Sequence, residues 1–190
     1  MITTSRIRVW DPLVRIFHWS LVAGVAANLF LTEEGGTTHQ WIGYGIAGFI
    51  GMRIVWGFIG PWSVRWKSFW PTPSRLKQAL RPNYTAASSD NITHTTLGAV
   101  MMLTLLALLI GLAVTGYMME ETTRFWGVDW VEEIHEVMAN ALLLLVPLHV
   151  IGAIVESIKK HDNLIGSMVH GYRRVQIPPQ HMTKHVDDRA

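Results

Sequence analysis

The sequence predicts an all-α membrane protein, a four-helix transmembrane bundle with both termini in the cytoplasm. Of the 190 residues, 49% are hydrophobic and only 16% are charged, which is apolar for a soluble domain of this size. Four weakly charged runs each approach the ~20 residues that cross a hydrocarbon core of ~30 Å. These runs cover residues 12–31, 40–59, 95–119 and 134–158.

Lysine and arginine are concentrated in alternate connections, which predicts the orientation. Fourteen of the sixteen lie near the N-terminus, in the long loop 60–93 or after residue 158, whereas connections 32–39 and 120–133 hold only Arg124 and seven carboxylates. The positive-inside rule therefore places both termini and the long loop in the cytoplasm. The loop also carries Trp62, Trp66 and Trp70, typical of a segment in the membrane interface. The net charge of +2 gives no reason to expect nucleic-acid binding.

Cysteine is absent from the chain. This excludes Cys-ligated iron–sulfur clusters, covalently attached c-type haem, thiolate catalysis and disulfides. Histidine and methionine remain as ligands for a soft metal or a haem iron.

The run 134–158 carries two histidines, His135 and His149, in a segment apolar enough to cross a membrane. On an α-helix, fourteen residues advance the chain by about 21 Å and return the side chains to nearly the same face. Ala139, Leu142 and Val146 lie between them on that face. An imidazole in hydrocarbon is unfavourable and marks function by default, so the stripe indicates two stacked cofactors, one toward each surface.

Two histidines in the earlier runs lie at matching depths. His39 precedes the second run at the outer surface, where His135 also lies. His18 lies about 9 Å below the cytoplasmic surface, close to the ~8 Å expected for His149. The sequence therefore predicts an outer pair, His39 with His135, and an inner pair, His18 with His149. Each pair has the two imidazoles that bind a haem iron axially, one from each of two facing helices.

Several other residues have two interpretations each. The second run contains four glycines, Gly43, Gly45, Gly48 and Gly51, which favour either close helix packing or a cofactor cleft. Arg53, at the depth of the inner pair, binds either haem propionates or lipid phosphate. His94 is too shallow for an inner ligand, and we expect it to contact a propionate or water.

A single histidine is more often a hydrogen-bonded core residue than a ligand, but four in two depth-matched pairs favour cofactor ligation. The main competitor is a non-redox metal carrier or scaffold whose histidines hold Zn²⁺ or Fe²⁺. Such a protein normally needs carboxylates or a clustered polar site, whereas the stripe between His135 and His149 is apolar.

Three segments together resemble the bacterial cytochrome b561 family, which includes the cytochrome b subunits of nickel–iron hydrogenases. These are RIFHWSLV in the first run, His39 followed by the glycine-rich run that reaches Arg53, and H-x13-H followed by KKHDNLIGSMVHGYRR. The likeness extends from Val9 to Arg174. It implies two haem b groups in a protein of the bacterial inner membrane, with His18, His39, His135 and His149 as the axial ligands. His94 also matches a recurrent family histidine.

The resemblance implies a respiratory-chain function, transmembrane electron transfer between a periplasmic partner and the membrane quinone pool. The partner would be a c-type cytochrome or a hydrogenase-like or dehydrogenase oxidoreductase, and a homodimer is compatible with the family. No side chain is expected to make or break a bond. The alternative is a stand-alone quinone-linked oxidoreductase that acts on a small species such as superoxide. We expect residues 1–175 to form the transmembrane domain, surrounded by membrane lipid, and residues 176–190 to form a polar tail.

Overall fold

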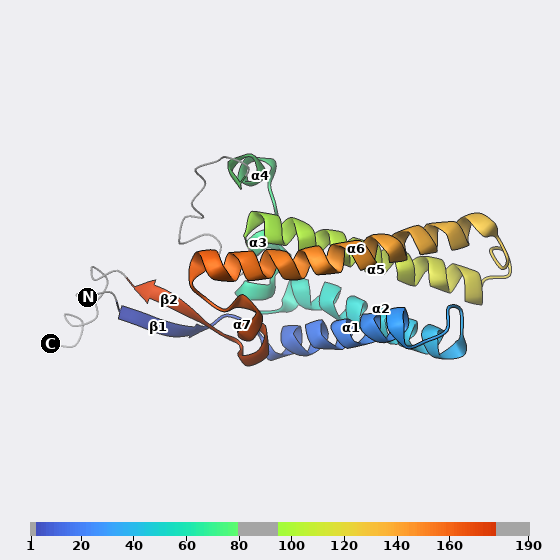
Figure 1. The fold of residues 1–190 in the computed structure, drawn as a ribbon, viewed down its shortest axis with the longest axis horizontal. Helices are drawn as coiled ribbons and strands as arrows, with labels where there is room; N and C mark the ends of the chain where they lie inside the picture. The colour runs from blue at the N-terminus through green and yellow to red at the C-terminus, as the bar shows by residue number, and fades with distance from the viewer. Residues whose placement is uncertain (1–2, 80–94, 178–190) are drawn as a thin grey trace.

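The computed structural model describes residues 3–79 and 95–177, and four long helices dominate it (Figure 1). They are long and apolar enough to cross a membrane, as predicted. These helices are α1 (Pro12–Phe30), α2 (Thr37–Ile59), α5 (Thr96–Glu121) and α6 (Asp129–Lys160). The shorter elements are β1 (Thr3–Arg8), η1 (Trp62–Val64), α3 (Trp66–Phe69), α4 (Pro73–Ala79), α7 (Leu164–His170) and β2 (Tyr172–Ile177).

Side-chain caps explain where the helices begin. Asp11 accepts a 2.8 Å hydrogen bond from the Leu13 amide, and Pro12 occupies the first turn of α1. Thr95 caps α5 in the same way through the Gly98 amide. The last helix starts at Asp129, five residues before the predicted start of the run. Asp129 and Glu132 in its first turn complement the helix dipole, and hydropathy alone does not detect this contribution.

The helices pack in chain order. In the described part of the chain, α1 packs along α2, α2 against α5, and α5 along α6, whereas α6 makes few close backbone approaches to α1 or α2 (Figure 1). A β-carbon at Gly111 would collide with the sulfur of Met138, so this glycine permits the close contact of α5 with α6. Helix α6 is therefore held tightly from one side and spaced more widely from α1 and α2.

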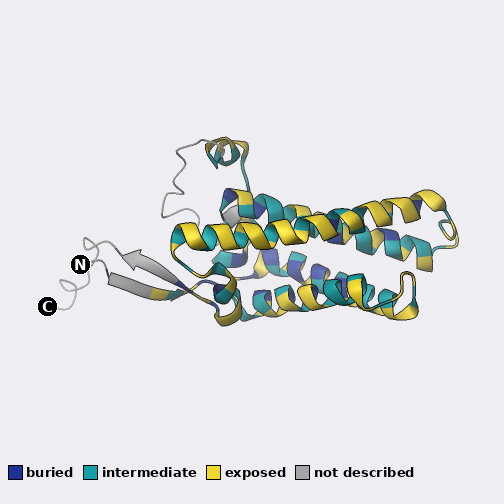
Figure 2. Cartoon of the chain, viewed as in Figure 1, coloured by how far each residue is buried: buried dark blue, intermediate teal, exposed yellow. Residues whose placement is uncertain are grey.

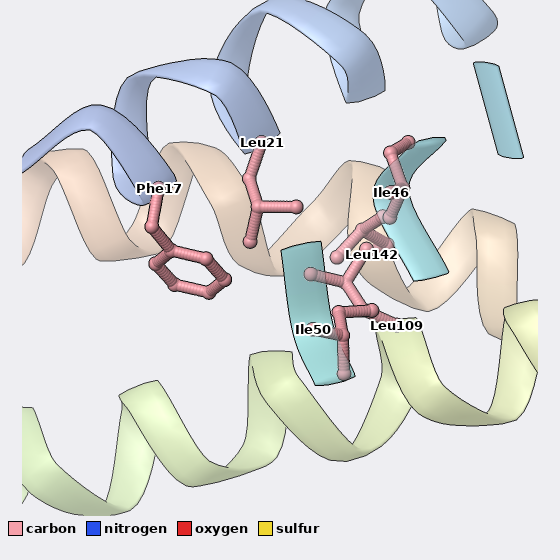
Figure 3. Packing of buried hydrophobic residues seen from close by; sticks show 6 residues of the cluster. All are labelled: Phe17, Leu21, Ile46, Ile50, Leu109 and Leu142. Atoms are coloured by element: carbon pink, nitrogen blue, oxygen red, sulfur yellow. The ribbon is translucent and has the colours of Figure 1, made fainter. Parts of the chain in front are cut away.

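One cluster of buried apolar side chains joins all four helices near the middle of the bundle (Figure 3). It consists of Phe17, Leu21, Ile46, Ile50, Leu109 and Leu142. Many large apolar residues outside this cluster are exposed, and Figure 2 shows exposed residues along the long helices, which suits a surface surrounded by lipid. Of the stripe predicted on α6, Leu142 is 3% exposed and Ala139 is half-buried, but Val146 is 37% exposed and lies outside this core.

A small two-stranded sheet joins the two ends of the chain, which the all-α prediction did not include. β1 and β2 pair antiparallel, with Thr3 opposite Ile177 and Arg8 opposite Tyr172 (Figure 1). Beside it, the indole of Trp10 donates a 3.0 Å hydrogen bond to the buried Ser167 hydroxyl of α7. These contacts fasten the start of α1 to the segment that follows α6.

The ion pair between Arg173 and Asp162 is predicted to stabilise this end of the molecule. Their side chains are 9% exposed and the Nε to Oδ2 distance is 2.8 Å. Asp162→Ala leaves a buried guanidinium without this carboxylate and should cost about 3 kcal/mol of unfolding free energy. The exposed i,i+4 pair of Glu156 with Lys160 is the control, and Glu156→Ala should cost about 0.5 kcal/mol or less. Thermal unfolding in detergent measures both, and equal losses would contradict the prediction.

Candidate functional site

The structure brings the two outer histidines together. His39 lies in the first turn of α2 and His135 in the second turn of α6. Their ring centroids are 6.3 Å apart and the ring planes are tilted by 59°. Two imidazoles that share a metal between them have centroids roughly 6 Å apart, since a metal–imidazole bond is about 2 Å and the ring centre lies about 1 Å from its nitrogen. The observed spacing fits one metal atom between the rings.

A threonine contacts the Nδ1 atom of each outer histidine. The Thr115 hydroxyl, from α5, lies 2.8 Å from Nδ1 of His135. The Thr32 hydroxyl, in the turn between α1 and α2, lies 3.4 Å from Nδ1 of His39. In both rings Nδ1 is thereby engaged and Nε2 remains for a ligand. Neither threonine is among the candidate residues predicted from the sequence. Matching depths could have found Thr115, because it lies six residues before the end of α5 and His135 lies six residues after the start of α6.

The inner histidines lie on α1 and α6. His18 on α1 and His149 on α6 are close enough for their charged forms to interact electrostatically. Nδ1 of His18 is buried and has no hydrogen-bond partner in the described part of the chain. A buried polar atom without a partner is unfavourable and calls for an explanation such as a bound group.

Both histidine pairs lie across the wider spacing of the bundle. One histidine of each pair comes from α6, and the other comes from α2 or α1, the helices that α6 does not pack along. Among residues 3–79 and 95–177, no three histidine, aspartate or glutamate side chains gather in a group that could hold a metal ion. The arrangement within this part of the chain is therefore one of pairs, as axial ligation of a planar cofactor requires.

Arg53 is buried, with only 5% of its surface exposed, so it does not reach for lipid phosphate. Its Nη2 donates a 3.3 Å hydrogen bond to the Val64 carbonyl, and the guanidinium lies 4.4 Å from the centre of the Trp66 ring. Its Nη1 is buried without a hydrogen-bond partner in the described residues. Arg53 thus keeps one donor for an acceptor such as a carboxylate. His94 lies outside the described residues.

The glycines of α2 differ in what they face. Gly45, Gly48 and Gly51 are exposed, and no atom lies within 4 Å of a β-carbon built on them, so they do not pack against another helix of this chain. Helical periodicity places them opposite the buried Ile46 and Ile50. Close packing within the chain, one of the two interpretations of the glycines, therefore does not apply to these three.

Gly43 lies on the His39 side of α2, one turn further along the helix. It is half-buried with equally open space beside it. The open space at Gly43 therefore lies on the side of α2 that carries His39.

The comparison with known families agrees with this geometry. The family model described as prokaryotic cytochrome b561 matches residues 9–171, which include all four paired histidines. The chain belongs to this family. No curated protein and no solved structure shows significant similarity to the chain.

Membership of the prokaryotic cytochrome b561 family makes this a b-type haem electron-transfer protein of the bacterial inner membrane. The residues present fit such a cofactor on four observations. These are the 6.3 Å spacing of the outer rings, the partnerless Nδ1 of His18, the spare donor of Arg53 and the open space at Gly43.

The position of Trp66 beside Arg53 depends on Gly57, which leads to a prediction. The Trp66 indole occupies the place of a β-carbon at Gly57 and donates a 3.2 Å hydrogen bond to the Ile54 carbonyl. Gly57→Ala should displace the indole and lower the unfolding free energy by about 1–3 kcal/mol. Gly48→Ala, in open space on the same helix, should be neutral or stabilise by about 0.5–1 kcal/mol through helix propensity. Thermal unfolding of both variants in detergent measures these effects. Equal melting temperatures for the two variants would contradict the prediction.

Proposed function

We propose that the protein binds two haem b groups and transfers electrons across the inner membrane. His39 and His135 hold the outer haem, and His18 and His149 hold the inner one. The observation that carries the proposal is the outer pair, with rings 6.3 Å apart and both Nδ1 atoms in contact with threonine hydroxyls. A haem held by two imidazoles supplies one-electron chemistry at iron and has no open coordination position for a substrate.

The chain's own contribution is to position the two sites and to exclude water between them. Helix α6 carries a ligand for each site, and fourteen residues separate these ligands by about 21 Å along the axis. Leu142 lies seven residues from each and belongs to the buried cluster that joins the four helices. A close-packed apolar layer of this kind keeps solvent out of the space between the sites.

Arg53 is proposed to pair with a propionate of the inner haem. Its partnerless Nη1 offers a charge-assisted hydrogen bond, and burial strengthens such a contact relative to one in water. For His94 we retain the expected contact with a propionate or water.

The distribution of charge supports an orientation with the β1–β2 end in the cytoplasm. The opposite end, where His39 and His135 lie, carries exposed carboxylates from the α1–α2 and α5–α6 connections and from the start of α6. They are Glu33, Glu34, Glu120, Glu121, Asp129, Glu132, Glu133 and Glu136. Such a surface attracts a basic periplasmic partner, a c-type cytochrome or a hydrogenase-like oxidoreductase, while the membrane quinone pool is the second partner.

Replacing single ligands tests the haem assignment. The purified protein should show a reduced-minus-oxidised b-type spectrum with about two haems per chain. His149→Ala should remove the inner haem and leave the outer one, and His39→Ala should do the reverse. His161→Asn is the control, because this exposed residue has a left-handed backbone that asparagine tolerates. Retention of both haems in both ligand variants would refute the pairing, and a colourless protein that binds Zn²⁺ would favour the metal-carrier alternative.

A second experiment separates an electron relay from a stand-alone oxidoreductase. Vesicles containing the protein and a quinone would be supplied with superoxide alone or with a reduced c-type cytochrome. We expect quinone reduction only with the protein donor, because six-coordinate sites leave no position at the iron for a small substrate. Sustained quinone reduction by superoxide alone would favour the enzyme.

A further inference from the structure

Two threonine hydroxyls form similar hydrogen-bond chains behind the outer histidines. The Thr115 hydroxyl lies 2.9 Å from the Gly111 carbonyl and 2.8 Å from Nδ1 of His135. The Thr32 hydroxyl lies 3.2 Å from the Asn28 carbonyl and 3.4 Å from Nδ1 of His39. In both cases the carbonyl belongs to the residue four positions earlier. The two chains come from different parts of the fold and converge on one site.

The hydrogens in these chains can be assigned from the chemistry of the groups. A carbonyl oxygen only accepts, and a threonine hydroxyl has one hydrogen to donate. Two carbonyls lie within reach of Thr115, that of Gly111 and that of Leu112 at 3.3 Å, so its hydrogen goes to the backbone. The hydroxyl oxygen then accepts from Nδ1 of His135. That ring carries its hydrogen on Nδ1 and presents an unprotonated Nε2 to the cofactor.

We propose that Thr115, and more weakly Thr32, are positioning residues that fix the tautomer and orientation of the outer axial ligands and lower the reduction potential of the outer haem. This inference rests on the proposed function. An imidazole that donates from Nδ1 is a more basic ligand, and a more basic ligand stabilises the ferric state. Thr115 has the stronger effect because its contact with the ring is shorter and its side chain is buried.

Both threonine contacts belong to the outer site, because Thr115 and Thr32 lie at Nδ1 of His135 and His39. Loss of these contacts should therefore change one haem and leave the other unchanged.

The test is a redox titration of the purified holoprotein in detergent, with the haem content measured in parallel. Thr115→Val removes the hydroxyl and keeps the shape of the side chain. This substitution should raise the reduction potential of the outer haem alone. It should also weaken haem retention at that site, because groups that hydrogen-bond to a metal-binding histidine typically contribute about 10–100-fold in affinity. Thr115→Ser keeps a hydroxyl, so the outer-haem potential and haem retention should stay close to those of the unmodified protein. Thr32→Val should shift the same haem in the same direction by less. Thr104→Val, exposed on the same helix, is the control.

The outcomes separate this inference from the proposed function. Titration of His149→Ala with and without Thr115→Val reports on the outer haem alone. If Thr115→Val has the same outer-haem reduction potential and the same haem content as the Thr104→Val control, the proposed role of Thr115 is overturned. Loss of the outer haem in Thr115→Val with retention in Thr115→Ser would support the need for the hydroxyl, and loss in both would overturn it. Absence of haem from the unmodified protein would instead refute the proposed function.

Discussion

The interior of this bundle is constrained by the need to provide partners for polar side chains inside hydrocarbon. Each histidine that α6 carries into the membrane has a counterpart on another helix, His39 on α2 or His18 on α1. The proposed haem sites would account for the packing of α6 along α5 but not along α1 and α2, since helices that hold a planar ring between them must stand apart. The apolar cluster around Leu142 lies between the two histidine pairs, and there the four helices meet.

Much of this arrangement could be predicted from the sequence because the relevant signals are local or periodic. Hydropathy located the four long helices, and helical rise was enough to match His39 with His135 by depth. The start of α6 was placed too late because Asp129 and Glu132 belong to its first turn but not to its apolar run. The sequence supports two interpretations of Arg53, because only the fold shows that its side chain is buried beside Trp66.

Other features depend on contacts between distant residues. β1 and β2 are short and polar, and each becomes a strand only by pairing with a segment more than 150 residues away. The contact of Thr115 with His135 joins two helices, and no sequence motif predicts it. The four glycines of α2 are close together in the sequence but differ in exposure, because a rotation of 100° per residue separates Gly43 from the other three, which face outward.

The pairing of β1 with β2 has a consequence for biosynthesis. Translation proceeds from the N-terminus, so Thr3–Arg8 leaves the ribosome long before Tyr172–Ile177 exists. The segment that precedes α1 therefore cannot form its β-sheet pairing until β2 has been synthesised. Because α6 contributes to both histidine pairs, neither pair can form earlier than that helix. If the proposed haem sites are correct, haem binding therefore follows the synthesis of α6, and the terminal sheet can form only after haem-ligating helices are already made.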